Sequence, residues 1–296
     1  MRAELDAALA RDDLPPEARE GLRNVRAVLD ADPQARLESV TVVGARPEAV
    51  IAFGDPLTAD LVVYLLHGTA TDLRSLPGWA SAAQRLCGDL IRSCIVRGLP
   101  RDIAVIVWFG WDSGDHSTAR ATTHATIGAA RLAVDIDRLA VRNPDAHIAL
   151  VTYSYSTTLL GELFALNLTD RVRTAVSIAS AGVTSAASMA LSDAISEERL
   201  TMYATEAVAD TIAPLGRLGQ HPIDPRDIAG VRGYSCDGGP APGVDGGRVT
   251  GAAVSGHASQ TWTDEYGIAH VGYFDERTQG YLTLVSLLAD AVASAR

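Results

Sequence analysis

The sequence predicts an α/β fold with a mostly parallel central sheet flanked by helices. Short all-apolar runs recur along the chain, as in strands that are buried on both faces of a sheet. Amphipathic segments with helical spacing alternate with these runs, which is the pattern of strands joined by crossover helices. The 296 residues are 47% hydrophobic, so the chain can build one large core.

Composition excludes several classes of function. The net charge of -11 argues against nucleic acid and anionic membranes as partners, and no stretch is long enough to span a membrane. All 25 basic residues are arginine, so no lysine is present for a Walker phosphate loop, a Schiff base, pyridoxal phosphate or a protein kinase. We therefore expect no cofactor, no nucleic-acid partner and no membrane partner. The sequence does not indicate an oligomeric state.

Cysteine usage and the start of the chain indicate the compartment. Cys87, Cys94 and Cys236 fit neither a disulfide framework nor a CxxC metal knuckle. The first residues are acidic and lack the apolar segment of a secretory signal. We expect a reducing, cytoplasmic location.

The chain begins with a predicted helical extension. Apolar residues recur at helical spacing on both sides of Pro15-Pro16, so residues 1–36 are assigned to this extension and residues 37–296 to the main domain. Strands are predicted at 37–43 and 49–53, where they would form an antiparallel start of the sheet.

Strands and helices then alternate. Buried strands are predicted at 61–66, 103–108, 148–151, 172–179 and 200–205, and helices at 79–96, 122–139 and 278–295. The segment 184–199 is either a lid or a crossover helix. The glycine-dense segment 230–256 is predicted to be a long flexible excursion, apart from a short strand near Val231.

Ser154 stands where an apolar strand passes directly into an amphipathic helix. A strand-turn-helix of this kind, the nucleophile elbow, lifts a serine hydroxyl above the carboxyl edge of a parallel sheet. The elbow usually has glycine two residues before and two after the serine, whereas this chain has Thr152 and Ser156. The alternative is an ordinary strand end that is capped by Ser156 or Thr157.

The loop that follows the predicted strand 61–66 lies at the same sheet edge. Its Gly68 would let the backbone approach a reacting carbonyl, so the N–H groups of Thr69 and Tyr155 are the candidate oxyanion donors. The alternative is that Gly68 and Thr69 only turn the chain and that Asp72 caps a helix.

A substrate pocket is predicted beside these donors, lined by His67, Gly68, Trp111, Asp112 and Tyr153. Alternatively, Trp111 belongs to the core and Asp112 or Asp115 caps the next helix, while His67 forms a structural hydrogen bond. No metal site is assigned, because the spacing of Asp112, Asp115, His116 and His124 matches no ligand motif.

Two further residues complete a constellation with Ser154. Asp210 follows the predicted strand 200–205, and His270 lies in a loop just before the last helix. A serine hydroxyl needs an imidazole to take its proton, and the imidazole needs a carboxylate to fix its tautomer. His257 is a second candidate base, and Asp193 and Asp264 are further candidate acids.

Several segments together resemble a known family. They are the region from Ala49 to Asp72 and the segments 107–112, 152–156, 204–211 and 270–274. They are similar to an α/β-hydrolase family of high-GC bacteria long catalogued as a domain of unknown function. The resemblance spans roughly residues 37–295 and implies an α/β-hydrolase fold.

The resemblance also implies roles for individual residues. The family's Gly-His-Ser-Tyr-Gly-Ser elbow matches this chain at Ser154 and Tyr155, and the chain departs from it at Thr152, Tyr153 and Ser156. By position, the resemblance implies that Ser154 is the nucleophile, Asp210 the acid and His270 the base.

Three functional hypotheses follow. The first is a serine hydrolase that acts on a small-molecule carboxylic ester or thioester through an acyl-Ser154 intermediate. The second is an acyltransferase or cyclase of specialised metabolism, in which a dry aromatic pocket around Trp108 and Trp111 would exclude water. The third is a non-catalytic binding protein on a hydrolase scaffold, which the altered elbow at Thr152 and Ser156 suggests.

Overall fold

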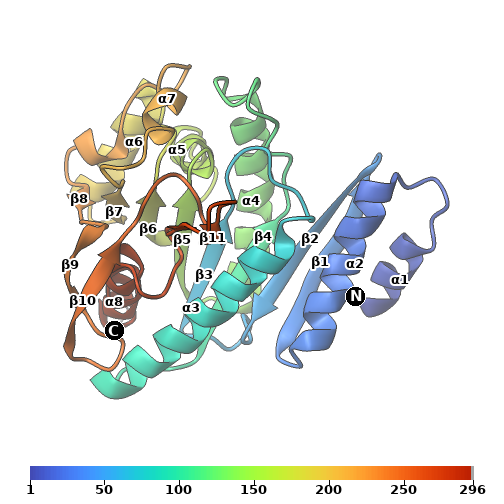
Figure 1. Ribbon diagram of the computed structural model, residues 1–296, viewed down its shortest axis with the longest axis horizontal. Helices are drawn as coiled ribbons and strands as arrows, with labels where there is room; N and C mark the ends of the chain where they lie inside the picture. Colours follow the sequence, from blue (N-terminus) through green and yellow to red (C-terminus); the bar gives the residue numbers. More distant parts are fainter. Residues whose placement is uncertain (295–296) are drawn as a thin grey trace.

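An eight-stranded sheet forms the centre of the molecule, and helices cover both of its faces (Figure 1). The computed structural model describes residues 1–294. In spatial order the strands are β1 (Ala35–Val43), β2 (Arg46–Phe53), β4 (Ile103–Phe109), β3 (Leu61–Leu66), β5 (His147–Tyr153), β6 (Val172–Ile178), β7 (Thr201–Thr205) and β8 (Arg232–Gly233). β2 pairs antiparallel with β1 and β4, and every other pair is parallel. The predicted, mostly parallel α/β sheet is confirmed.

Each face of the sheet is covered by its own set of helices. On one face lie α2 (Pro16–Ala31), α3 (Leu76–Arg97) and α8 (Gln279–Ser294), whose apolar side chains share one core cluster with β3. On the other face lie α4 (Thr123–Arg142), α5 (Ser156–Ala165) and α6 (Ser185–Ser196), which form a second cluster. The all-apolar strands therefore bury side chains on both faces, as a parallel sheet requires.

The N-terminal segment packs directly on the sheet. α1 (Arg2–Leu9) lies against α2, at the edge of the molecule marked by the N-terminus in Figure 1. Leu22 and Val25 of α2 are fully buried in the same cluster as Leu61 of β3. The predicted helices are present, and the boundary at residue 36 stays a prediction.

The segment 184–199 contains α6, which crosses from β6 to β7 and packs against α5. Of the two alternatives for this segment, a lid or a crossover helix, the structure shows the crossover helix. Of the residues described, no helix is both long and apolar enough to traverse a bilayer.

The glycine-dense segment is an ordered ribbon, so the prediction of a flexible excursion was wrong. β9 (Asp237–Pro242) and β10 (Arg248–Ala253) pair antiparallel and pack against α8. A Cβ atom on Gly251 would lie 2.4 Å from the backbone nitrogen of Gln279, and Gly239 has a φ of +128°. Glycine is needed there because the ribbon touches the helix backbone and turns sharply.

Candidate active site

Ser154 lies in the tight turn that joins β5 to α5. Its φ is +57°, in the left-handed region that residues other than glycine seldom adopt. The turn is fixed by a hydrogen bond of 2.9 Å from the Ser154 N–H to the Ile178 carbonyl of β6. A strained backbone at this position indicates a functional constraint, because the surrounding sheet must hold it in place.

Hydroxyl groups replace the usual glycines around this turn. The Ser156 hydroxyl accepts a hydrogen bond of 2.8 Å from the Tyr153 N–H, and its own proton faces the carbonyl oxygens of Tyr153 and Leu66. The Thr152 hydroxyl lies 3.1 Å from that of Thr157. Both side chains are fully buried, so these hydrogen bonds satisfy polar groups that would otherwise be costly to bury.

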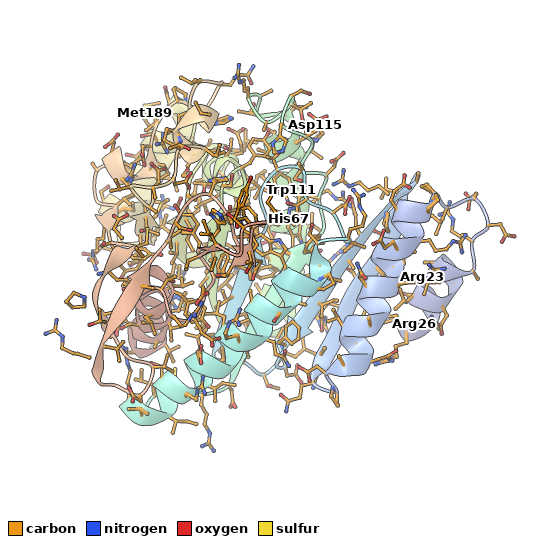
Figure 2. The ribbon with its side chains drawn as sticks, in the orientation of Figure 1. Arg23, Arg26, His67, Trp111, Asp115 and Met189 are labelled. Atoms are coloured by element: carbon orange, nitrogen blue, oxygen red, sulfur yellow. The ribbon has the colours of Figure 1, made fainter. Side chains whose placement is uncertain are left out.

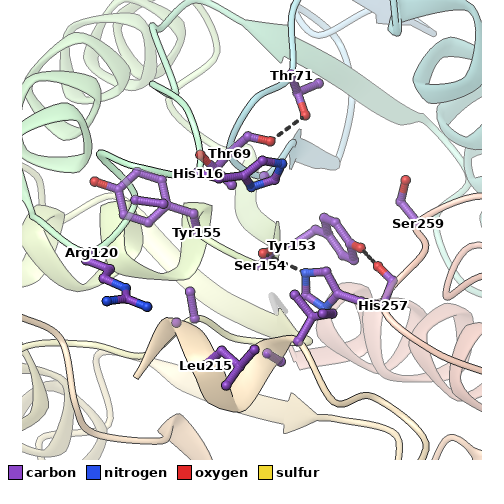
Figure 3. Close-up of a pocket in the computed structure, with 16 residues that line it drawn as sticks. Thr69, Thr71, His116, Arg120, Tyr153, Ser154, Tyr155, Leu215, His257 and Ser259 are labelled. Atoms are coloured by element: carbon purple, nitrogen blue, oxygen red, sulfur yellow. Dashed lines mark hydrogen bonds between the residues drawn. The ribbon is translucent and has the colours of Figure 1, made fainter. Parts of the chain in front are cut away.

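An imidazole and a carboxylate continue from the Ser154 hydroxyl. The Ser154 Oγ lies 3.0 Å from Nε2 of His257 (Figure 3), and Nδ1 of His257 lies 2.8 Å from Oδ2 of Asp210. Because a carboxylate only accepts, Nδ1 is the donor in its contact with Asp210, and in a ring protonated at Nδ1 alone Nε2 can accept the serine proton. The three side chains can therefore move a proton from the serine to the imidazole.

Asp210 is buried, and both of its oxygens are occupied. Oδ1 accepts the backbone N–H groups of Ile212 and Ala213 at 3.0 Å each, and Oδ2 accepts His257 together with the Tyr273 hydroxyl at 2.9 Å. Burial by itself would raise the pKa of Asp210, but these hydrogen bonds and the interaction with His257 lower the pKa below its usual value. The carboxylate therefore stays ionised.

The structure does not place His270 beside Ser154, which corrects the sequence-based assignment. His270 Nε2 lies 2.9 Å from Asp264, and its ring stacks on Trp262 with the ring centroids 4.3 Å apart. These residues belong to a small hairpin formed by β11 (Trp262–Thr263) and β12 (Ala269–His270). In the sequence this hairpin is inserted between His257 and α8. His270, the histidine closer to the last helix in sequence, therefore lies in the hairpin, and His257 lies beside Ser154.

The other candidate acids also lie elsewhere. Asp264 pairs with His270, and Asp193 lies exposed on α6. His257 is instead held by its surroundings, since its carbonyl accepts a hydrogen bond from the Tyr153 hydroxyl. One sequence signal could have indicated His257 as the base: it follows closely after the glycine-containing ribbon of β9 and β10.

The loop after β3 passes directly over Ser154. A Cβ atom on Gly68 would lie 3.0 Å from that of Ser154, so this close approach favours glycine. The Thr69 hydroxyl donates to the Ser113 carbonyl at 3.1 Å, which fixes the loop. In residues 1–294 the N–H groups of Thr69 and Tyr155 donate to no backbone carbonyl.

A cavity of about 450 Å³ opens beside the serine. Its lining includes Gly68 and Tyr153, together with Thr69, Ser154, Tyr155 and His257. The further lining residues are Thr71, His116, Ala119, Arg120, Ala181, Ile212, Ala213, Leu215, Gly216 and Ser259. A volume of this size suits a small organic ligand.

Three predicted pocket residues lie outside this lining. His67 is buried between the rings of Phe109 and Trp111, and burial lowers its pKa to about 4 (Figure 2 labels His67 and Trp111). Trp111 packs in the core, where Gly128 of α4 gives its ring room. Asp112 turns away and pairs with Arg46.

No group of three or more His, Cys, Asp and Glu side chains within residues 1–294 could hold a metal ion. His124 Nδ1 faces the Asp112 carbonyl at 3.0 Å, and the Asp115 carboxylate accepts hydrogen bonds from Ser117 and Thr118 of its own loop.

The mostly parallel sheet and the serine turn at its edge are those of an α/β hydrolase, and comparison with protein families gives the same class. The family model for α/β hydrolases matches residues 44–220. The match covers more than half of the chain and includes β3, the serine turn and Asp210. The chain belongs to the α/β hydrolase family.

Solved structures with a similar fold include three hydrolases. A cold-adapted esterase from an Arctic intertidal metagenomic library is 13% identical, with a TM-score of 0.42, and the match covers 69% of this chain and 84% of that one. A lidless α/β serine hydrolase from Xanthomonas campestris is 11% identical, with a TM-score of 0.43 and coverages of 89% and 95%. A dienelactone hydrolase from Anabaena variabilis is 13% identical, with a TM-score of 0.44 and coverages of 88% and 98%. No curated protein matches the sequence.

Proposed function

We propose that this protein is a serine hydrolase that cleaves a carboxylic ester or thioester through an acyl-Ser154 intermediate. The observation that supports this proposal is the continuous line from Ser154 through His257 to Asp210, with contacts of 3.0 and 2.8 Å. His257 takes the role that the sequence assigned to His270.

Each residue has a defined part in the proposed reaction. His257 takes the proton of Ser154 as the hydroxyl oxygen attacks the substrate carbonyl, and Asp210 stabilises the resulting imidazolium. The N–H groups of Thr69 and Tyr155 donate to the oxyanion of the tetrahedral intermediate. His257 then protonates the leaving oxygen or sulfur, and a water molecule repeats the sequence on the acyl-enzyme.

The two other hypotheses receive less support. The acyltransferase or cyclase hypothesis relies on an aromatic pocket around Trp108 and Trp111, and both side chains lie in the core outside the cavity lining. The binding-protein hypothesis relies on the unusual residues Thr152 and Ser156, whose hydroxyl groups form hydrogen bonds within the turn. Neither hypothesis is favoured by a specific contact.

Covalent labelling tests the proposal. A fluorophosphonate probe is expected to label the wild-type protein at Ser154, and the folded Ser154→Ala variant is expected to remain unlabelled. Turnover of 4-nitrophenyl acetate should be lost in the same variant. Labelling of Ser154→Ala at the wild-type rate would contradict the proposed nucleophile.

The two histidines provide a matched pair of variants. His257→Asn is expected to lower kcat by about 10³-fold or more, because the serine loses its base. His270→Asn removes a histidine from the hairpin and should retain the wild-type rate. The reverse result would restore the assignment made from the sequence.

A further inference from the structure

Arg120 brings a positive charge to the lining of the cavity beside Ser154, although the protein as a whole carries a net charge of -11. Its ionisable lining residues, apart from two tyrosines, are His116, Arg120 and His257, and this lining contains no aspartate or glutamate among the residues described. Asp210 lies behind His257 and is occupied by its four donors. The local charge therefore favours an anionic group in the cavity.

Arg120 is the fixed positive charge of this lining. Within the described part of the chain no carboxylate pairs with its guanidinium. Several other arginines are ion-paired, as Arg217 is with Glu206 at 2.6 Å and Arg46 is with Asp112, whereas Arg120 is exposed and lines the cavity. An arginine that lines a cavity without a protein partner is available to a ligand.

The backbone around Arg120 is held in place by three neighbouring contacts. The Ala119 carbonyl lies 2.9 Å from Nε2 of His221, and the Arg120 carbonyl accepts the Gln220 N–H at 2.8 Å. The Ala121 carbonyl accepts the hydroxyl of Tyr155. The main chain that carries Arg120 is therefore fixed relative to Tyr155 and His221, while its side chain is exposed.

The position of Arg120 relative to the base indicates which part of a substrate it would meet. Figure 3 shows Arg120 and His257 on opposite sides of Ser154. The leaving atom of an ester must face His257 Nε2 to receive its proton. The acyl chain then extends away from His257, toward Arg120.

Part of the cavity lining is apolar. Ala181, Ile212, Ala213 and Leu215 contribute apolar side chains to it. Methylene groups of an acyl chain would lie against these side chains, with the charged end at the guanidinium. Guanidinium binds a carboxylate through two parallel hydrogen bonds.

We infer that the acyl group of the substrate is a short apolar chain that ends in a carboxylate, so that the substrate is the half-ester or half-thioester of a dicarboxylic acid. This inference rests on the proposed hydrolase function, and Arg120 is its specificity-determining residue.

Two esters of matched length test the inference. The probes are 4-nitrophenyl hydrogen adipate, which carries the free carboxylate, and methyl 4-nitrophenyl adipate, in which that group is neutral. The six-carbon acid is chosen because shorter half-esters hydrolyse by intramolecular attack of their own carboxylate. We expect kcat/KM to be about tenfold higher for the anionic ester at low salt.

Three variants connect this preference to Arg120. Arg120→Gln is expected to reduce the anionic-to-neutral ratio of kcat/KM about tenfold, and Arg120→Lys should retain part of the preference as a point charge. Arg23→Gln is the control, since Arg23 lies exposed on α2, far from the cavity (Figure 2). An unchanged ratio in Arg120→Gln, or no preference in the wild type, would overturn the inference.

A binding measurement separates this inference from the proposed function. Adipate is titrated calorimetrically into Ser154→Ala and into the double variant that also carries Arg120→Gln. Binding that is weakened about tenfold in the double variant supports the anionic subsite even if neither ester is turned over, in which case the hydrolase proposal alone fails. Equal binding, or no binding by Ser154→Ala, would overturn the subsite.

Discussion

The hydroxyl of Tyr273 donates a hydrogen bond of 2.9 Å to Oδ2 of Asp210, the same oxygen that accepts Nδ1–H of His257. The Tyr273 oxygen in turn accepts the Ala207 N–H at 2.9 Å, so its proton is directed at the carboxylate. Tyr273 is therefore a positioning residue, because it acts on the base through Asp210.

Tyr273→Phe is expected to lower kcat/KM for 4-nitrophenyl acetate about tenfold, because a charge-assisted hydrogen bond to the carboxylate is lost. The same loss leaves more negative charge on the carboxylate that faces the base, so the acid limb of the pH profile should move to higher pH. Steady-state kinetics between pH 4 and 9 measure both effects.

Tyr281→Phe is the matched control for this variant. Tyr281 is also buried and donates to a carboxylate, Asp89, at 2.7 Å, but it lies on α8 outside the cavity lining. It should lose stability without a shift of the pH profile. A shift of equal size in both variants would contradict the role of Tyr273.

Tyr153→Phe removes the hydroxyl that donates to the His257 carbonyl. We expect the rate of fluorophosphonate labelling to fall about three- to tenfold, because the imidazole is then held less firmly opposite Ser154. Tyr234→Phe is the control, since within residues 1–294 its buried hydroxyl has no hydrogen-bond partner to lose. Equal rates for Tyr153→Phe and the wild type would show that the contact does not position the base.

Ser156→Ala is expected to lower the free energy of unfolding by about 1–2 kcal/mol, because the Tyr153 N–H loses the hydroxyl that it donates to. Urea denaturation measures the change. Ser196→Ala removes an exposed hydroxyl at the end of α6 and should change stability by less than about 0.5 kcal/mol. A loss for Ser156→Ala as small as that of the control would contradict the assigned role.

Stability should fall as the pH is lowered from about 6.5 to about 4. Burial lowers the pKa of His67 to about 4, so the unfolded chain binds a proton near pH 6.5 while the folded chain does not. This difference amounts to about 3 kcal/mol at pH 4. His147, whose pKa is also lowered to about 4 by burial, adds to the same slope.

His67→Gln is expected to reduce that slope, because glutamine does not titrate and can keep the donor to the Gly68 carbonyl. Urea denaturation of both proteins at several pH values between 4 and 7 measures it. A variant with the full wild-type slope would show that His67 does not titrate in this way.

The fold and half of the site could be predicted from local patterns. Ser154 and Asp210 each follow a predicted strand, and the carboxyl ends of parallel strands meet at one sheet edge. The base could not be placed in this way. His257 follows the ribbon of β9 and β10, and the hairpin with His270 is inserted before α8.

The pocket residues show a second limit of the sequence. His67 and Trp111 both stand at the ends of strands that reach the site, yet both side chains turn into the core. Trp111 does so because Gly128 of α4 leaves space for the indole, where a Cβ atom would lie 2.6 Å from the ring. The packing of α4 against the sheet brings Gly128 to the Trp111 ring, and neither local periodicity nor a motif predicts such a contact.

Tyr153 directly precedes Ser154 and also holds the main chain of His257. Tyr153 thus links the strand that ends at the nucleophile to the loop that carries the base, and its aromatic ring has a fixed length. A collective displacement of the C-terminal ribbon would have to move this side chain as well. The strand that ends at the nucleophile is therefore also tied to the loop that carries the base, so any movement of that loop away from Ser154 must first break this hydrogen bond.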